Sequence, residues 1–221
     1  MSLKKLFLLS FALFSLGDLA AVMAGSGAER LLKPGILVSL ICYYIVAAEG
    51  KLIRKFLIAL ILCLAGDILL IFARQDQQYF LLGLMAFLSA HVMYLQVFRA
   101  LINPERTAGT RYELLPFIVL LIISGIIVVV HLYKDLNEML MPVSIYTIVI
   151  ILMAINALMR KGKTSPLSFY LVLTGALLFM TSDIALAMNK FRGEFAHSGL
   201  LIMGTYCSAQ LLIVLGVLRH D

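Results

Sequence analysis

The sequence predicts an all-α membrane protein of about eight transmembrane helices arranged as antiparallel hairpins, in one membrane domain over residues 1–221. Of the 221 residues, 62% are hydrophobic, and the mean hydropathy is +1.03. Soluble domains contain roughly 45–50% apolar residues. Apolar runs of about 17–25 residues, the length that crosses a hydrocarbon layer, alternate with short polar breaks. None of these breaks is long enough for a soluble domain.

Eight apolar runs follow one another along the chain. In order, they cover residues 3–24, 33–49, 52–73, 79–101, 112–132, 138–159, 167–189 and 197–218. The breaks between them carry turn and charge signals: "GSGAER", "EGKLIRK", "RQDQQ", "NPERTAGTR", "YKDLNE", "RKGKTSP" and "NKFRGE". Because the connections are short, neighbouring helices are expected to form antiparallel hairpins.

The first two runs have informative starts. "MSLKKLFLLSFALFSLG" has a basic start and an apolar centre, which is also the outline of a cleaved signal peptide. The run is long for such a region, and Asp18 falls where the region should be apolar, so we expect a retained helix. In the second run, Lys33 is expected to open the helix directly before Pro34, a residue favoured in the first turn.

The basic residues predict how the chain lies in the membrane. Of the 18 Lys and Arg residues, twelve fall on the side of the N-terminus and six on the other: Arg30, Lys33, Arg74, Lys134, Lys190 and Arg192. Positive residues resist translocation, so we expect both termini in the cytoplasm and the protein in a bacterial inner membrane. The net charge of +6 is thus attributed to topology, and no nucleic-acid partner is expected.

Three acids lie inside apolar runs: Asp18, Asp67 and Asp183. Their contexts, "LGDLAAVM", "AGDILLIF" and "TSDIALAM", resemble one another, and each comes about seven residues before its run ends. At 1.5 Å per residue this is roughly 10 Å deep. In the predicted topology all three lie at one level, in the half of the bilayer away from the cytoplasm. An ionisable group there costs about 2.5–3.5 kcal/mol, so it usually marks function.

Further polar side chains reach the same region and are candidate substrate-binding or orienting residues. They are Lys33, His91, Tyr94, Asn156, Tyr206 and Gln210, with Tyr146 as a further polar group. His91 and Tyr94 are three residues apart and share a helix face. Each also has a structural interpretation, because intramembrane polar groups often only join helices. Lys33 is expected either to bind a phosphate headgroup or to extend to the interface.

The chain resembles the YhhN-like membrane proteins, a family that includes the animal lysoplasmalogenases. The matching segments are "KP" at 33–34, "GDILLIF" at 66–72, "FLLGLMAFLSAHVMY" at 80–94, "GALLFMTSDIALA" at 175–187 and "TYCSAQLLI" at 205–213. The resemblance implies hydrolysis of the vinyl ether bond of a lysoplasmenyl-ethanolamine or -choline, which gives a fatty aldehyde and a glycerophospho-headgroup. It also implies that Asp67 and Asp183 are the catalytic pair.

A vinyl ether is cleaved by protonation of its β-carbon and capture of the oxocarbenium ion by water. Two carboxyl groups in a site of low dielectric supply the acid and the base, as in glycosidases. The residues alone do not distinguish which Asp has which role. No cofactor is expected and no metal is assigned, since Cys42, Cys63 and Cys207 form no pair and the central part of the chain offers a single His.

Two other classes of function remain open at this point. Intramembrane acids in repeated hairpins also occur in proton-coupled carriers, and they can hold helices together in a membrane protein without enzymatic activity. A hydrolase acts on lysolipid in detergent, whereas a carrier needs a sealed vesicle. A structural role predicts that Asp-to-Asn changes affect stability alone.

Overall fold

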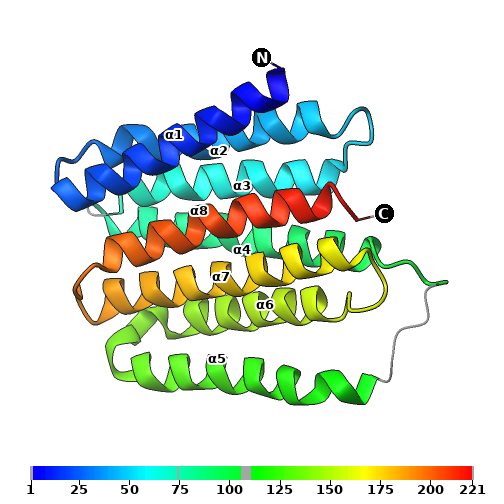
Figure 1. Cartoon of the computed structure of the whole chain (residues 1–221). Helices are drawn as coiled ribbons and strands as arrows, with labels where there is room; N and C mark the ends of the chain where they lie inside the picture. Colours follow the sequence, from blue (N-terminus) through cyan, green and yellow to red (C-terminus); the bar gives the residue numbers. More distant parts are fainter. Residues whose placement is uncertain (1, 74, 106–110, 221) are drawn as a thin grey trace. The chain divides into compact units, whose positions relative to one another are not determined.

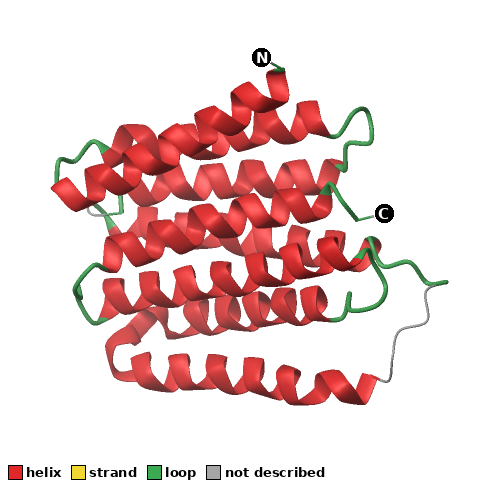
Figure 2. Ribbon diagram, in the orientation of Figure 1, coloured by secondary structure: helices red, strands yellow, loops and turns green. Residues whose placement is uncertain are grey.

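The computed structural model describes residues 2–73, 75–105 and 111–220, and the elements within these ranges are all helices (Figures 1 and 2). The α-helices are α1 (Leu3–Ala24), α2 (Glu29–Ala47), α3 (Arg54–Ile71), α4 (Gln77–Ala100), α5 (Leu115–Leu136), α6 (Leu140–Leu158), α7 (Pro166–Phe191) and α8 (Ser198–Val217). Two short 3₁₀ helices, η1 (Arg111–Leu114) and η2 (Asn137–Met139), precede α5 and α6. Arg74 and Arg106, which were counted for the membrane orientation, lie outside the described residues.

The all-α membrane class is confirmed, but the expected number of about eight spans is too high. Among the described residues, six segments are long and apolar enough to cross a membrane. One of them, Tyr112–Leu158, is 47 residues long and contains both α5 and α6. Helix α3 is not among the six, because its 18 residues include the three charged side chains of Arg54, Lys55 and Asp67.

Helix α2 begins earlier than its sequence predicts. Glu29 is its first residue, so Lys33 does not open the helix and Pro34 lies inside it. A proline at this position has no N–H to donate to the carbonyl of Arg30. The apolar pattern gave no sign of this first turn, because "ERLLK" is polar at three of its five positions. The correction moves Lys33 one full turn into the helix.

The chain forms two compact units, residues 1–94 and 95–221, and α4 runs from the first into the second. In unit 1, α2 packs against both α1 and α3. Phe56 of α3 is fully buried between Tyr44 and Tyr94, with ring centroids 4.9 and 5.6 Å away. Tyr44 accepts a hydrogen bond from the backbone N–H of Ile53 at 2.8 Å, directly before α3 begins. Aromatic packing and this bond fix α3 against α2.

In unit 2, glycines allow α7 and α8 to approach closely. A Cβ atom on Gly216 would lie 2.6 Å from Val172 Cγ2 and 3.0 Å from the Val172 backbone nitrogen. A Cβ on Gly175 would lie 3.0 Å from the carbonyl oxygen of Ala209. Small residues at helix interfaces bring backbones into contact in membrane proteins. These two positions therefore set the spacing of the α7–α8 pair.

Arg160 is buried between the end of α6 and the start of α7. It is fully buried, donates from Nη2 to Ser168 Oγ at 2.8 Å, and lies 5.7 Å from the Phe98 ring centroid. Ser168 in turn donates to the carbonyl oxygen of Gly216 at 2.6 Å. Burial lowers the pKa of the Arg160 guanidinium to about 10, so the group stays charged at neutral pH. From the sequence, Arg160 was counted only as one of the basic residues between two apolar runs.

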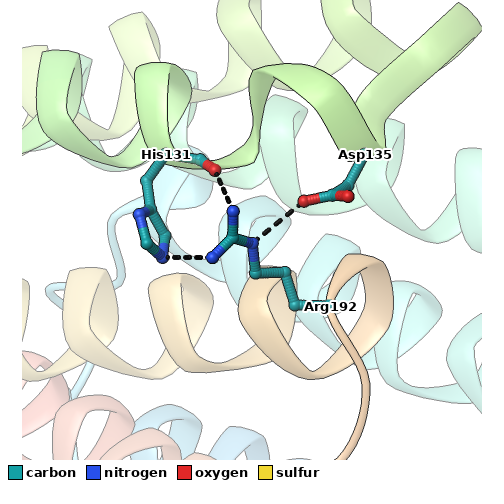
Figure 3. Close-up of polar contacts among 3 residues, drawn as sticks. All are labelled: His131, Asp135 and Arg192. Atoms are coloured by element: carbon teal, nitrogen blue, oxygen red, sulfur yellow. Dashed lines mark hydrogen bonds and ion pairs between the residues drawn. The ribbon is translucent and has the colours of Figure 1, made fainter.

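Arg192 joins the C-terminal ends of α5 and α7 (Figure 3). Its Nε donates to Asp135 Oδ2 at 2.9 Å, and Nη2 donates to the backbone carbonyl of His131 at 2.9 Å. Nη1 lies 2.9 Å from His131 Nε2. Since a guanidinium only donates, Nε2 is the acceptor and His131 carries its proton on Nδ1. One side chain thus holds a full turn of α5 against the end of α7.

Because α7 and α8 lie close together, one methyl group added at their interface is expected to change the stability of the protein strongly. Gly216→Ala should lower the free energy of unfolding by about 1–3 kcal/mol, because its methyl group overlaps α7. Gly204→Ala on the same helix is the matched control, since no atom lies within 4 Å of its Cβ position. Unfolding of the purified variants in detergent micelles, followed by circular dichroism, measures both. Equal stability of the two variants would contradict the packing described.

Candidate functional site

Asp67 lies in α3 with its carboxylate almost completely buried and paired with Lys33 of α2. The side chain of Asp67 is 2% exposed, that of Lys33 is 18% exposed, and Lys33 Nζ lies 3.4 Å from Asp67 Oδ1. The preceding Gly66 faces Phe87 of α4, where a Cβ atom would lie 2.6 Å from the ring. The sequence singled out both Lys33 and Asp67 but did not predict that they form an ion pair.

Asp18 of α1 is the second buried acid of unit 1. It is fully buried, and neither of its carboxylate oxygens has a hydrogen-bond partner within the part of the chain that the structure describes. The charges of Lys33, Asp67 and Glu29 act on it. From the sequence, Asp18 is expected at the level of Asp67 and has no assigned role. The structure brings it into the electrostatic neighbourhood of the Lys33–Asp67 pair.

His91 and Tyr94, expected on one helix face, are both buried in α4. Gly83 and Phe87 are buried on the same face, so the four residues follow in steps of four, four and three. His91 is completely buried, and its ring centroid lies 6.5 Å from that of Tyr94. The Tyr94 hydroxyl lies 3.7 Å from Cys63 Sγ of α3. This face of α4 therefore packs on α3. The contact with Cys63 lies one helical turn before Asp67.

Asp183 of α7 is half-buried in unit 2 and accepts a hydrogen bond from a tyrosine. Tyr146 of α6, itself 7% exposed, donates from its hydroxyl to Asp183 Oδ2 at 2.6 Å. The preceding Ser182 donates to the carbonyl oxygen of Ile202 in α8 at 3.0 Å. Asp183 is thus held between two neighbouring helices by its own bond and by that of Ser182.

The other three candidates of unit 2 differ in their surroundings. Tyr206 of α8 is buried, with its ring perpendicular to Phe179 at 5.5 Å, and Gln210 one turn further is fully buried. Asn156 is half-buried and donates to the carbonyl oxygen of Leu152 in its own helix at 2.8 Å. This local bond agrees with the structural interpretation of Asn156.

Unit 1 therefore brings together Lys33 and Asp67, with Asp18 nearby, and unit 2 brings together Tyr146 and Asp183. The catalytic pairing of Asp67 with Asp183 stays a prediction, since the two belong to different units. Within residues 2–73, 75–105 and 111–220, no three His, Cys, Asp or Glu side chains are grouped as ligands for a metal ion. The chemistry on which these sites can draw is that of carboxyl, ammonium and phenol groups.

Comparison with known proteins identifies related sequences. Residues 28–217 match the YhhN family. Bovine "Lysoplasmalogenase TMEM86A" is 33% identical over 169 residues, which are 75% of this chain and 65% of that protein. Human "Lysoplasmalogenase TMEM86B" is 34% identical over 166 residues, which are 73% of this chain and 62% of that protein. The chain thus spans slightly less than two thirds of these relatives, and no solved structure matches it.

The Lys33–Asp67 pair predicts non-additive effects on stability. Lys33→Met should lower the free energy of unfolding by about 3 kcal/mol, because it leaves a buried carboxylate without its counter-charge. The double variant Lys33→Met, Asp67→Asn should recover most of this loss, since both charges are then removed. Lys4→Met is the control, because Lys4 forms an exposed ion pair with Glu49 and should show no measurable change.

A double-mutant cycle in detergent micelles measures the coupling between Lys33 and Asp67. Additive effects of the two single substitutions would mean that the ion pair does not form in the folded protein.

Proposed function

Because the chain belongs to the YhhN family, we propose that it is a lysoplasmalogenase-like ether hydrolase acting on a lysophospholipid in the membrane. The bond cleaved is the vinyl ether of a lysoplasmenyl lipid, and the products are a fatty aldehyde and a glycerophospho-headgroup. The observation that carries the proposal is the pair of differently supported acids, Asp67 with Lys33 and Asp183 with Tyr146. The bovine and human relatives are named lysoplasmalogenases, which supports the same activity.

The surroundings of the two acids favour a division of roles. An ammonium group 3.4 Å from Asp67 Oδ1 stabilises the carboxylate, so we assign Asp67 as the base that activates water. Tyr146 donates from its phenol hydroxyl to Asp183 Oδ2 at 2.6 Å. The mechanism needs one acid beside this base, and the bond to Oδ2 leaves Oδ1 as the atom that carries the proton. We therefore assign Asp183 as the acid.

The reaction then proceeds in balanced steps. Asp183 transfers its proton to the β-carbon of the vinyl ether, and the positive charge develops on the α-carbon and ether oxygen. Asp67 takes a proton from water as the water oxygen bonds to the α-carbon, which gives a hemiacetal. On collapse, the glycerol oxygen leaves with the proton from Asp67, and the hemiacetal hydroxyl returns its proton to Asp183. Both acids regain their starting states, with one water consumed.

The remaining candidates have supporting roles in this proposal. Lys33 extends three donors from its ammonium group, so it can contact a headgroup phosphate as well as Asp67. His91, Tyr94, Tyr206 and Gln210 are proposed to orient the water or the glycerol hydroxyl. The protein is an integral membrane protein; a bacterial inner membrane and cytoplasmic termini are proposed from the distribution of its basic residues.

Neutralising either acid should abolish turnover while the protein still folds. Asp67→Asn and Asp183→Asn should each lower kcat at least about 100-fold, because loss of a general acid or base costs about 10²–10⁴. Asp76→Asn is the matched control, since Asp76 is exposed and accepts a local bond from the Gln78 backbone. Aldehyde release from a lysoplasmalogen in detergent, measured by mass spectrometry, gives the rates.

Near-normal turnover by both purified variants would overturn the mechanism. Loss of folded protein in both variants, with no alkenyl hydrolysis by the parent chain, would favour a structural role for the two acids.

A further inference from the structure

Tyr146 lies on the buried face of α6 and presents its hydroxyl to α7. Val143, Tyr146 and Ile150 follow one another in steps of three and four residues, and they are 5%, 7% and 5% exposed. A tyrosine has two side-chain torsions, so the packing of its ring also fixes the place of its hydroxyl. That hydroxyl donates to Asp183 Oδ2 at 2.6 Å, within unit 2. Asp183 thus meets a donor whose position is set by the packing of α6.

The backbone of α7 beside Asp183 is held by α8. Ser182 is 3% exposed and donates to the carbonyl oxygen of Ile202 at 3.0 Å. The carboxyl group of an aspartate rotates broadly about its last torsion, so a fixed backbone does not by itself orient it. The bond from Tyr146 holds Oδ2 and thereby sets the direction of Oδ1.

The bond from Tyr146 is expected to strengthen as Asp183 acts as an acid. When the proton leaves Oδ1, negative charge spreads over both carboxylate oxygens, and Tyr146 then donates to a charged acceptor. Hydrogen bonds to charged acceptors are roughly twice as strong as neutral ones. An interaction that is stronger in the transition state than in the ground state accelerates the chemical step. The tyrosine keeps its own proton, so the proton balance of the reaction is unchanged.

We propose that Tyr146 is a positioning residue that directs Oδ1 of Asp183 toward the β-carbon of the vinyl ether and stabilises the carboxylate left after proton transfer. This role rests on the proposed function, in which Asp183 is the acid. Tyr146 acts through Asp183 and has no assigned contact with the lipid. Its hydroxyl should therefore contribute to the chemical step and not to substrate binding.

Kinetics of Tyr146→Phe, which removes the hydroxyl and keeps the ring, test this division. The kcat for a lysoplasmalogen should fall about tenfold, the effect of about one charge-assisted hydrogen bond. The KM should stay within about twofold of the parent value, because a transition-state interaction is lost and ground-state binding is kept. Tyr170→Phe is the matched control, since Tyr170 of α7 is 65% exposed, and it should keep both constants.

Infrared spectroscopy tests the bond to Asp183 without turnover. In alkyl maltoside micelles, which contain no ester carbonyl, the protonated carboxyl of Asp183 gives the carbonyl band that Asp183→Asn lacks. With the proton on Oδ1, the carbonyl oxygen is Oδ2, which accepts from Tyr146. Tyr146→Phe should therefore move this band to higher wavenumber, and Tyr170→Phe should leave it in place. If Tyr146→Phe does not fold, 3-fluorotyrosine at position 146 replaces it: the more acidic phenol donates more strongly and should move the band to lower wavenumber.

A band that stays in place when Tyr146 is changed would overturn the proposal. So would a folded Tyr146→Phe variant with the parent kcat, or one in which only the KM changes. Hydrolysis by the parent chain together with any of these results would reject this inference alone. The expected band shift without aldehyde release by the parent chain would reject the proposed function alone.

Discussion

A buried ionised side chain must find its counter-charge within the protein, and the Lys33–Asp67 pair meets this constraint in unit 1. The Asp67 carboxylate is almost completely buried, and the ammonium 3.4 Å away supplies its counter-charge. The pair connects α2 with α3, and Tyr44 and Phe56 pack the same two helices together. This ion pair is the feature that connects the position of Lys33 inside α2, the ionised state of Asp67 and the charges around Asp18.

The two conspicuous acids of the chain are supported in chemically different ways. Asp67 is paired with a cation, whereas Asp183 accepts from a phenol. A hydrolysis that needs one proton donor and one proton acceptor is favoured by such a difference, because carboxyl groups in different surroundings can hold different protonation states at one pH. Asp18 adds a third acid without a donor of its own. In the proposed mechanism, Asp67 and Asp183 carry out the chemistry.

Most helix positions and the shared face of His91 and Tyr94 could be predicted from the sequence, because hydrophobic runs and steps of three or four residues are local properties. The partners that side chains find on neighbouring helices could not be predicted. The bond from Tyr146 to Asp183 and the pair of Lys33 with Asp67 depend on helix rotation, which lipid-facing apolar residues do not specify. Arg160 was assigned to a loop because no local pattern distinguishes a buried arginine from an exposed one. The start of α2 was missed because its first turn is polar.

The central claim is that this chain protonates a vinyl ether carbon and hydrates the cation that results. Mass spectrometry of the products formed from a lysoplasmalogen by the purified full chain in D₂O, with immediate reduction of the aldehyde, tests it most directly. The account predicts a single carbon-bound deuterium on the carbon next to the former carbonyl, and no carbon-bound deuterium in the glycerophospho-headgroup. The absence of aldehyde, or an aldehyde without deuterium on that carbon, would contradict the account.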